Sequence, residues 1–224
     1  MAQEIRSLAF RWVNACLVRT GAGFALIDTG FTNNRGQLEK ALSRASCWPG
    51  DLKLIVITHG DPDHTASAAY LRERYGAKIA THRAEAAAVE RGDMFLSRGP
   101  LPPLRRMVKP LMALFRLRKR DRFTPDLYLE DGDSLKEYGF DASVLRVPGH
   151  SAGSIAILTA DGDFFSGDFL ENRTRPSAAT LVDDREALKT SLERVRKLDI
   201  RIVYPGHGAA FTMAEMGQSL WHRE

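Results

Sequence analysis

The sequence LKLIVITHGDPDH, at residues 52–64, predicts a buried strand that leads directly into a turn rich in metal-binding side chains. Residues 52–58 are almost continuously apolar and largely β-branched, which is typical of a strand buried on both faces. Four potential ligands follow: His59, Asp61, Asp63 and His64. A strand would send only alternate side chains to one face, whereas a turn can bring all of them to one point. Carboxylates and imidazoles this close repel or compete unless a cation holds them together, so the turn predicts a metal site.

Three later segments each place one more potential ligand at the end of a predicted strand. They are Pro148-Gly149-His150, Ser166-Gly167-Asp168 and Pro205-Gly206-His207. The glycine beside each ligand permits close approach of the backbone. A single residue of this kind is more often part of an ordinary turn. Their succession after the first cluster favours a metal centre assembled from distant parts of the chain.

Two β-rich halves that each carry helices surround these motifs. Strands are expected at residues 15–19, 24–28, 52–58, 77–80, 143–147, 154–159, 163–166 and 201–204, and helices at 37–45, 65–76, 83–91 and 185–198. The glycines at 21 and 23 predict a hairpin turn between the first two strands. Such a pattern is typical of two packed sheets with helices outside.

The ordered set of motifs resembles the metallo-β-lactamase superfamily. The similarity rests on the turn at 59–64, on His150, Asp168 and His207, and on an early Asp28-Thr29-Gly30 turn, and it spans about residues 13–208. It implies an α/β (α+β) protein, a four-layer αββα sandwich with a dinuclear metal site on the sheet edges. We expect one domain over residues 1–224, with a basic and apolar insertion at about 92–124.

The resemblance also assigns the ligands. Site one would consist of His59, Asp61 and His150, and site two of Asp63, His64 and His207, with Asp168 bridging both. Asp28 would order the ligand loop without binding metal. Asp61 departs from the family's usual motif, which has histidine there. An anionic oxygen donor makes iron or manganese more competitive with zinc, so we expect two divalent ions, with zinc first.

The activity that the resemblance implies is hydrolysis of an ester, thioester or lactone by a hydroxide that bridges the metal ions, as in glyoxalase II and acyl-homoserine lactonases. Asp63 would orient the water or carry its proton. Flavodiiron proteins also have a carboxylate at the position of Asp61, so a diiron redox protein is the alternative. A nuclease would require RNA binding by Arg105, Arg106, Arg116 and Arg118. Because this segment lacks the set of aromatic side chains that stacks unpaired bases, no nucleic-acid partner is expected.

A serine hydrolase is the competing interpretation. Gly149-His150-Ser151-Ala152-Gly153 fits the G-x-S-x-G nucleophile elbow, and Asp183 and His207 follow in the chain order of a triad. An elbow needs a helix directly after the serine, whereas residues 154–166 predict a hairpin. We therefore expect Ser151 and Ser154 to form hydrogen bonds within the turn that presents His150.

Composition limits the remaining possibilities. The 224 residues are 44% hydrophobic and 27% charged, which excludes disordered and collagen-like classes. No apolar run reaches the ~18–20 residues of a membrane span, and no signal peptide is recognisable, so a cytoplasmic protein is expected. The two cysteines form no disulfide framework.

The net charge is +4, and much of the excess lies within residues 98–122. That segment would pack its apolar side chains on the domain, or act as a lid or membrane contact for an anionic or amphipathic small-molecule substrate.

Overall fold

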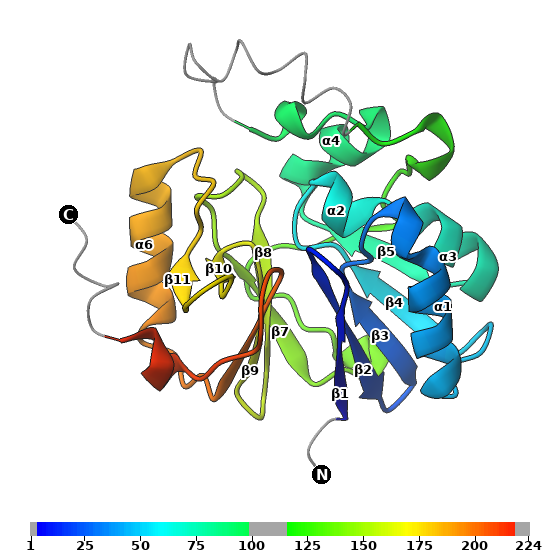
Figure 1. Cartoon of the computed structure of the whole chain (residues 1–224), viewed down its shortest axis with the longest axis horizontal. Helices are drawn as coiled ribbons and strands as arrows, with labels where there is room; N and C mark the ends of the chain where they lie inside the picture. The colour runs from blue at the N-terminus through cyan, green and yellow to red at the C-terminus, as the bar shows by residue number, and fades with distance from the viewer. Residues whose placement is uncertain (1–3, 99–115, 218–224) are drawn as a thin grey trace.

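The computed structural model describes residues 4–98 and 116–217, and it shows two sheets packed face to face between helices (Figure 1). Within these ranges the first sheet has six strands: β1 (Ile5–Ala9), β2 (Asn14–Thr20), β3 (Gly23–Ile27), β4 (Leu52–Val56), β5 (Lys78–Thr81) and β6 (Leu127–Tyr128). β1, β2 and β3 pair antiparallel, and β3 to β6 run parallel. The predicted hairpin at Thr20–Gly23 is confirmed.

The second sheet is built from the second half of the chain. Its strands lie in the order β12 (Ile202–Pro205), β9 (Asp163–Gly167), β8 (Ile155–Thr159) and β7 (Ala142–Arg146). β7, β8 and β9 pair antiparallel, whereas β12 runs parallel to β9. A small ribbon of β10 (Leu170–Glu171) and β11 (Ser177–Ala178) follows β9. Since β9 and β12 are parallel, the residues that follow them emerge at the same edge.

Helices cover the outer faces of both sheets. Among the described residues the α-helices are α1 (Arg35–Arg44), α2 (Pro62–Thr65), α3 (Ala68–Tyr75), α4 (Ala86–Arg91) and α6 (Arg185–Val195). Short 3₁₀ segments are η1 (Thr32–Asn34), η2 (Arg83–Glu85), η3 (Met94–Leu96), η5 (Lys119–Asp121), η6 (Lys136–Tyr138) and η7 (Met213–Met216). In Figure 1, α1 and α3 lie against the first sheet and α6 against the second.

The prediction of one continuous helix over residues 65–76 is wrong. The structure breaks it between α2 and α3, because Ser67 is tied to the early turn: its amide donates to Thr29 Oγ1 (3.2 Å) and its hydroxyl donates to the carbonyl of Phe31 (3.2 Å). The predicted end is correct, since Gly76 takes a left-handed conformation with φ 74°. The helix predicted over 83–91 likewise begins as the 3₁₀ segment η2 before α4.

Three apolar layers hold the sandwich together. Leu38 of α1 and Leu71 of α3 pack on the outer face of the first sheet. Side chains of both sheets, including Val56 and Ile157, fill the space between them, and Leu188 and Val195 of α6 pack on the second sheet. Within residues 52–57, Ile55 and Ile57 face the helices whereas Leu54 and Val56 face the other sheet. This double burial explains the continuous apolar run, and the predicted αββα fold class is confirmed.

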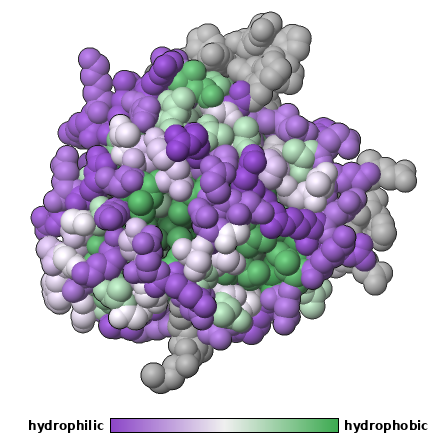
Figure 2. All heavy atoms as spheres, turned by 180° about the vertical axis from the view of Figure 1, so that it is seen from behind, coloured by the Kyte–Doolittle hydropathy of each residue, from purple (hydrophilic) through white to green (hydrophobic). Residues whose placement is uncertain are grey.

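The predicted insertion at about 92–124 is only partly visible. Residues 99–115, including Arg105 and Arg106, lie outside the described residues. In its last part Leu117 and Phe123 are buried while Arg116 and Arg118 are exposed, as expected for a segment that packs its apolar side on the domain. No helix in the described ranges has the length and apolar character needed to cross a membrane. Seen from behind, the surface is largely hydrophilic, with apolar side chains in patches between charged ones (Figure 2).

Candidate metal centre

The structure brings all seven candidate ligands to one place, where loops from the two sheets meet. Three overlapping groups of ligand atoms, each within 4.8 Å of one another, contain every one of them: His59, Asp61 and His150; His59, His64 and Asp168; and Asp63, His64 and His207. His59 lies in the loop after β4, and Asp63 and His64 lie on α2, at the upper end of the first sheet in Figure 1. Asp168 and His207 follow the parallel strands β9 and β12.

Asp168 occupies the middle of the cluster. Its Oδ1 is 3.2 Å from His64 Nε2, and its Oδ2 is 3.2 Å from His207 Nε2. The same Oδ2 lies 3.9 Å from His59 Nε2 and 4.0 Å from His150 Nε2. One carboxylate therefore faces all four imidazoles, which is the position that a bridging ligand requires.

The other two carboxylates separate the imidazoles into two pairs. Asp61 Oδ2 is 3.7 Å from His59 Nε2 and 3.4 Å from His150 Nε2. Asp63 Oδ2 is 3.7 Å from His64 Nε2 and 3.5 Å from His207 Nε2. These pairs coincide with the two sites that the resemblance implies. Asp61 also begins α2 without a capping hydrogen bond from its side chain, which leaves its carboxylate free to face the cluster.

The backbone and neighbouring side chains fix which nitrogen each imidazole presents. Nδ1 of His150 lies 2.7 Å from the carbonyl oxygen of Leu181, and Nδ1 of His207 contacts the carbonyl oxygen of Trp12. A carbonyl oxygen only accepts, so Nδ1 carries the proton in both rings. Nε2 then offers its lone pair to the cluster, which is the arrangement found in metal-binding histidines.

Asp28 and Thr58 orient the other two rings. Asp28 Oδ2 is 2.8 Å from His64 Nδ1 and accepts the hydroxyl proton of Thr58 (2.8 Å). Because that proton is used, Thr58 Oγ1 accepts from His59 Nδ1 at 3.0 Å. The Asp28 Oδ1 atom accepts from the Thr58 amide (2.9 Å), so one carboxylate organises two histidines. The structure thus places Asp28 beside the ligand loop, where the resemblance implies that it lies.

Burial and charge shift the pKa values of two of these rings in opposite directions. Burial, with the neighbouring His64 ring acting in the same direction, lowers the pKa of His59 well below its usual value. Burial also opposes the charged form of His64, but the Asp168 and Asp28 carboxylates outweigh it and raise the pKa of His64 well above its usual value.

Four buried polar atoms of the cluster have no hydrogen-bond partner among the described residues: His59 Nε2, Asp61 Oδ1, His64 Nε2 and Asp168 Oδ1. Leaving such an atom unsatisfied costs about 1–3 kcal/mol, so a concentration of them in one place indicates a missing ligand. Nitrogen and carboxylate oxygen donors are those that bind zinc, iron and manganese. Gly206 adds to the fit, because a Cβ atom there would overlap the Asp168 carboxylate and lie 2.7 Å from His64 Cε1.

Two residues of the site escape prediction from sequence. Arg98 is known from the sequence only as the start of a basic segment, yet its Nη2 donates to Asp61 Oδ2 at 2.6 Å. Glu85 is fully buried and joins the two ligand loops. It accepts from the amide of Gly60 (2.8 Å) on one side, and from the Ser151 hydroxyl (2.7 Å) and the Gly153 amide (2.9 Å) on the other. Neither residue stands in a motif or near its partners along the chain.

Replacing Glu85 with glutamine should loosen this junction. The amide group has one acceptor oxygen, so its NH₂ group must face a donor, either at Gly60 or at Ser151 and Gly153. We expect the free energy of unfolding of the metal-free protein to fall by about 1–3 kcal/mol, measured by urea denaturation. Glu130→Gln, at an exposed carboxylate beside His82, is the matched control and should change it by less than about 0.5 kcal/mol. Equal effects of the two variants would contradict the assignment.

The serine hydrolase interpretation is not supported by these contacts. Ser151 donates to Glu85 and lies 2.8 Å from Ser154 Oγ, as expected for hydrogen bonding within the turn. Asp183 accepts from Arg98 (3.1 Å), and His207 Nδ1 contacts the carbonyl of Trp12. β8 follows the serine where a nucleophile elbow would have a helix.

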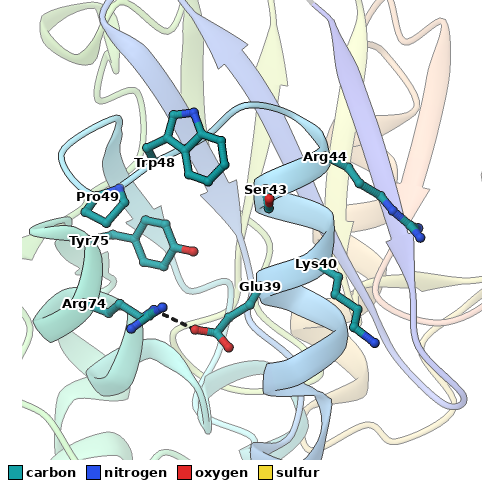
Figure 3. Close-up of a pocket in the computed structure, with 8 residues that line it drawn as sticks. All are labelled: Glu39, Lys40, Ser43, Arg44, Trp48, Pro49, Arg74 and Tyr75. Carbon is teal, nitrogen blue, oxygen red and sulfur yellow. Dashed lines mark ion pairs between the residues drawn. The ribbon is translucent and has the colours of Figure 1, made fainter.

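A separate surface cavity lies between α1 and α3, on the outer side of the first sheet (Figure 3). It has a volume of about 430 Å³ and is lined by Glu39, Lys40, Ser43, Arg44, Trp48, Pro49, Arg74 and Tyr75. Arg74 spans it to reach Glu39 at 2.6 Å. None of the candidate ligands lines this cavity, so it is not part of the metal centre.

Comparison with known proteins agrees with the fold and the cluster. Hydroxyacylglutathione hydrolase GloC from Haemophilus influenzae is 28% identical over 200 residues, covering 87% of this chain and 84% of that protein. Acyl-coenzyme A thioesterase MBLAC2 from Bos taurus is 32% identical over 176 residues, covering 69% of this chain but only 57% of that protein.

Solved structures extend the similarity to three dimensions. The structure of TTHA1623 in a di-iron-bound form superposes with a TM-score of 0.71 at 28% identity, covering 94% of this chain and 95% of that one. BLEG-1, a B3 metallo-beta-lactamase, has a TM-score of 0.73 at 23% identity and so supports the fold alone. A family model described as the metallo-beta-lactamase superfamily matches residues 10–207, which include every candidate ligand. This match confirms the resemblance seen in the motifs: the chain belongs to the metallo-beta-lactamase superfamily.

Proposed function

We propose that this chain is a metal-dependent hydrolase that binds two divalent ions and cleaves an ester, thioester or lactone bond of a small molecule. The proposed ligands are His59, Asp61, Asp63, His64, His150, Asp168 and His207. One observation carries the proposal: four imidazoles face the single carboxylate of Asp168, with buried donor atoms left unsatisfied. When bound, the two cations would acidify water and polarise a carbonyl group.

The chain's own residues would supply position and proton transfer. Asp63 has the most exposed side chain of the three carboxylates, at 22% compared with 7% for Asp61 and 11% for Asp168. It therefore lies closest to the entering solvent and is suited to orient a water molecule and accept its proton. Asp28 and Thr58 would hold the His59 and His64 rings in their orientation while the water molecule loses its proton.

Thioesters are the first substrates to test. One relative is named an acyl-coenzyme A thioesterase and another a hydroxyacylglutathione hydrolase. An acyl group joined to the sulfur of glutathione or coenzyme A is a thioester, so both names point to the same bond type. The metal is proposed to be zinc or iron, since Asp61 supplies an oxygen donor and a solved relative holds two irons.

Metal content and a hydrolysis screen on the same preparation test this function. We expect metal on the protein as purified, turnover of thioesters above lactones and phosphodiesters, loss of turnover on chelation and its return with added metal. Ser151→Ala should keep most of the turnover. Hydrolysis that survives chelation but is lost in Ser151→Ala would contradict the proposal and favour a serine nucleophile.

A diiron redox protein is the second candidate, favoured by the Asp61 carboxylate and by the di-iron form of the relative. Protein purified without oxygen separates the two functions. Iron with an absorption spectrum that changes on reduction, together with no hydrolysis in the screen, would support the redox function. Hydrolysis that depends on the bound metal, with no such spectral change, supports the hydrolase.

A further inference from the structure

Arg98 lies within the candidate metal centre, with its side chain only 3% exposed. Its Nη2 is 2.6 Å from Asp61 Oδ2 and 3.1 Å from His150 Nε2. Asp61 Oδ2 is the oxygen of that carboxylate that faces the imidazoles. His150 Nε2 is the nitrogen through which His150 would bind metal. The guanidinium group therefore contacts two of the three proposed ligands of site one at their donor atoms.

While Arg98 Nη2 contacts His150 Nε2, this nitrogen cannot bind a metal ion. Arginine has no acceptor, and His150 Nδ1 carries its proton toward Leu181, so in the neutral ring, which is the form that binds metal, Nε2 accepts from Nη2. Nε2 has a single lone pair, which cannot point at a guanidinium proton and a metal ion together. Asp61 Oδ2 could serve both, but His150 could not. A cation can complete site one only after Nη2 has moved away.

Site two has no such competitor in the part of the chain that the structure describes. Within it, the ion-pair partners of Asp63 and Asp168 are all histidines, and no arginine or lysine reaches either carboxylate. His64 Nε2 has no hydrogen-bond partner there. The two halves of the cluster therefore differ in whether a guanidinium group already contacts their donor atoms.

We propose that Arg98 is an internal cation that fills site one in the metal-free protein, so that the two metal sites load unequally. Site two binds first, and site one binds only when the guanidinium group is displaced. This inference rests on the proposed function, because it requires the same seven residues to bind metal. It gives Asp61 a counter-charge in the metal-free state, which a histidine at that position would not need.

The second anchor of Arg98 allows such a displacement. Nη1 donates to Asp183 Oδ2 (3.1 Å) and to the carbonyl of His150 (2.9 Å), on the opposite edge of the group from Asp61. The guanidinium group can therefore turn about Nη1 and keep one carboxylate partner while Nη2 leaves. Arg98 is thus a positioning residue that controls access to the site-one ligands.

Zinc titration of the metal-free protein by isothermal calorimetry tests the proposal. The wild-type chain should bind Zn²⁺ in two steps, a tight one and a weaker one. Arg98→Met removes the competing donor and keeps the length of the side chain. It should strengthen the second step by about 10–100-fold, the value of one charge-assisted hydrogen bond, and leave the first step unchanged.

Two further variants test whether the effect is specific to the contacts of Arg98 and does not follow from the loss of any buried arginine. Asp183→Asn leaves Arg98 and every proposed ligand in place but removes the charge of the carboxylate that the guanidinium group keeps while Nη2 leaves, so it should weaken the second step. Arg35→Met removes another largely buried arginine, paired with Asp121 at 2.7 Å and in contact with none of the proposed ligands, and should leave both steps unchanged.

Three results would overturn the inference. One is two equal, tight steps in the wild-type chain, and another is a second step that Arg98→Met and Asp183→Asn leave unchanged. A weaker second step in Arg98→Met would show that the guanidinium supports the ligands instead of competing with the metal. If no form of the protein binds Zn²⁺, the proposed metal centre itself fails, which separates the two claims.

Discussion

Asp168→Ala is expected to abolish loading of the metal centre and to lower hydrolysis by more than about 100-fold, the upper end of the loss caused by removing a group that only supports a ligand. The reason is geometric, because the carboxylate lies between 3.2 and 4.0 Å from Nε2 of all four histidines. Without it the two proposed sites lose their shared ligand and part of the negative charge that would balance two cations. Metal content after gel filtration, with turnover measured on the same sample, reports both effects.

The matched control is Asp131→Ala, which removes an exposed carboxylate paired with Arg194 (2.8 Å) at the surface. It should leave metal content and turnover unchanged. Circular dichroism of Asp168→Ala should match that of the wild-type chain, since the three apolar layers do not include this residue. Wild-type metal content in a folded Asp168→Ala protein would contradict the assignment of Asp168 as the bridge.

The sequence alone predicts the fold through burial and the ligand positions through strand ends. β4 could be recognised because both faces of this strand are covered, Ile55 by the helices and Val56 by the other sheet, which requires a continuous apolar run. His150, Asp168 and His207 could be recognised because each follows a strand and a glycine. Burial of a strand and the position of a ligand at a strand end are both determined by neighbouring residues, so the local sequence pattern indicates them.

Contacts between distant segments are what the sequence did not show. Arg98 lies 37 residues from Asp61, and Glu85 lies 66 residues from Ser151. Their charges are ordinary for an exposed segment and for the start of a helix, so nothing nearby marks them as buried. The break between α2 and α3 has the same origin, since the Ser67 hydroxyl bonds to a carbonyl 36 residues away. An alanine-rich local sequence favours an unbroken helix, and tertiary hydrogen bonds override it.

Arg98 and Asp61 are best understood together. A carboxylate at 5% exposure is costly to bury without a counter-charge, and Arg98 supplies that charge at 2.6 Å. A neutral imidazole at position 61 would need no such partner. The departure of Asp61 from the usual motif therefore affects the protein without metal as well as the choice of metal.

Asp28→Asn should lower zinc affinity by about 10–100-fold, although Asp28 would not touch the metal. Asn has one acceptor oxygen where Asp28 uses two, toward the Thr58 amide and toward the pair of donors at Thr58 Oγ1 and His64 Nδ1. If the NH₂ group faces Thr58 N, two donors oppose each other. If it faces His64, the imidazole must move its proton to Nε2, which removes the lone pair that would bind metal.

The substitution leaves the backbone undisturbed, because Asp28 has φ 58° and asparagine tolerates this left-handed conformation as well as aspartate does. Competition between the protein and a chromophoric chelator measures the zinc affinity. Asp121→Asn is the matched control: it alters another buried carboxylate, paired with Arg35, and should lower the free energy of unfolding without changing zinc affinity. Wild-type affinity in Asp28→Asn would mean that Asp28 does not set the proton position on His64, and the preorganisation of site two would then have to come from the helix α2 alone.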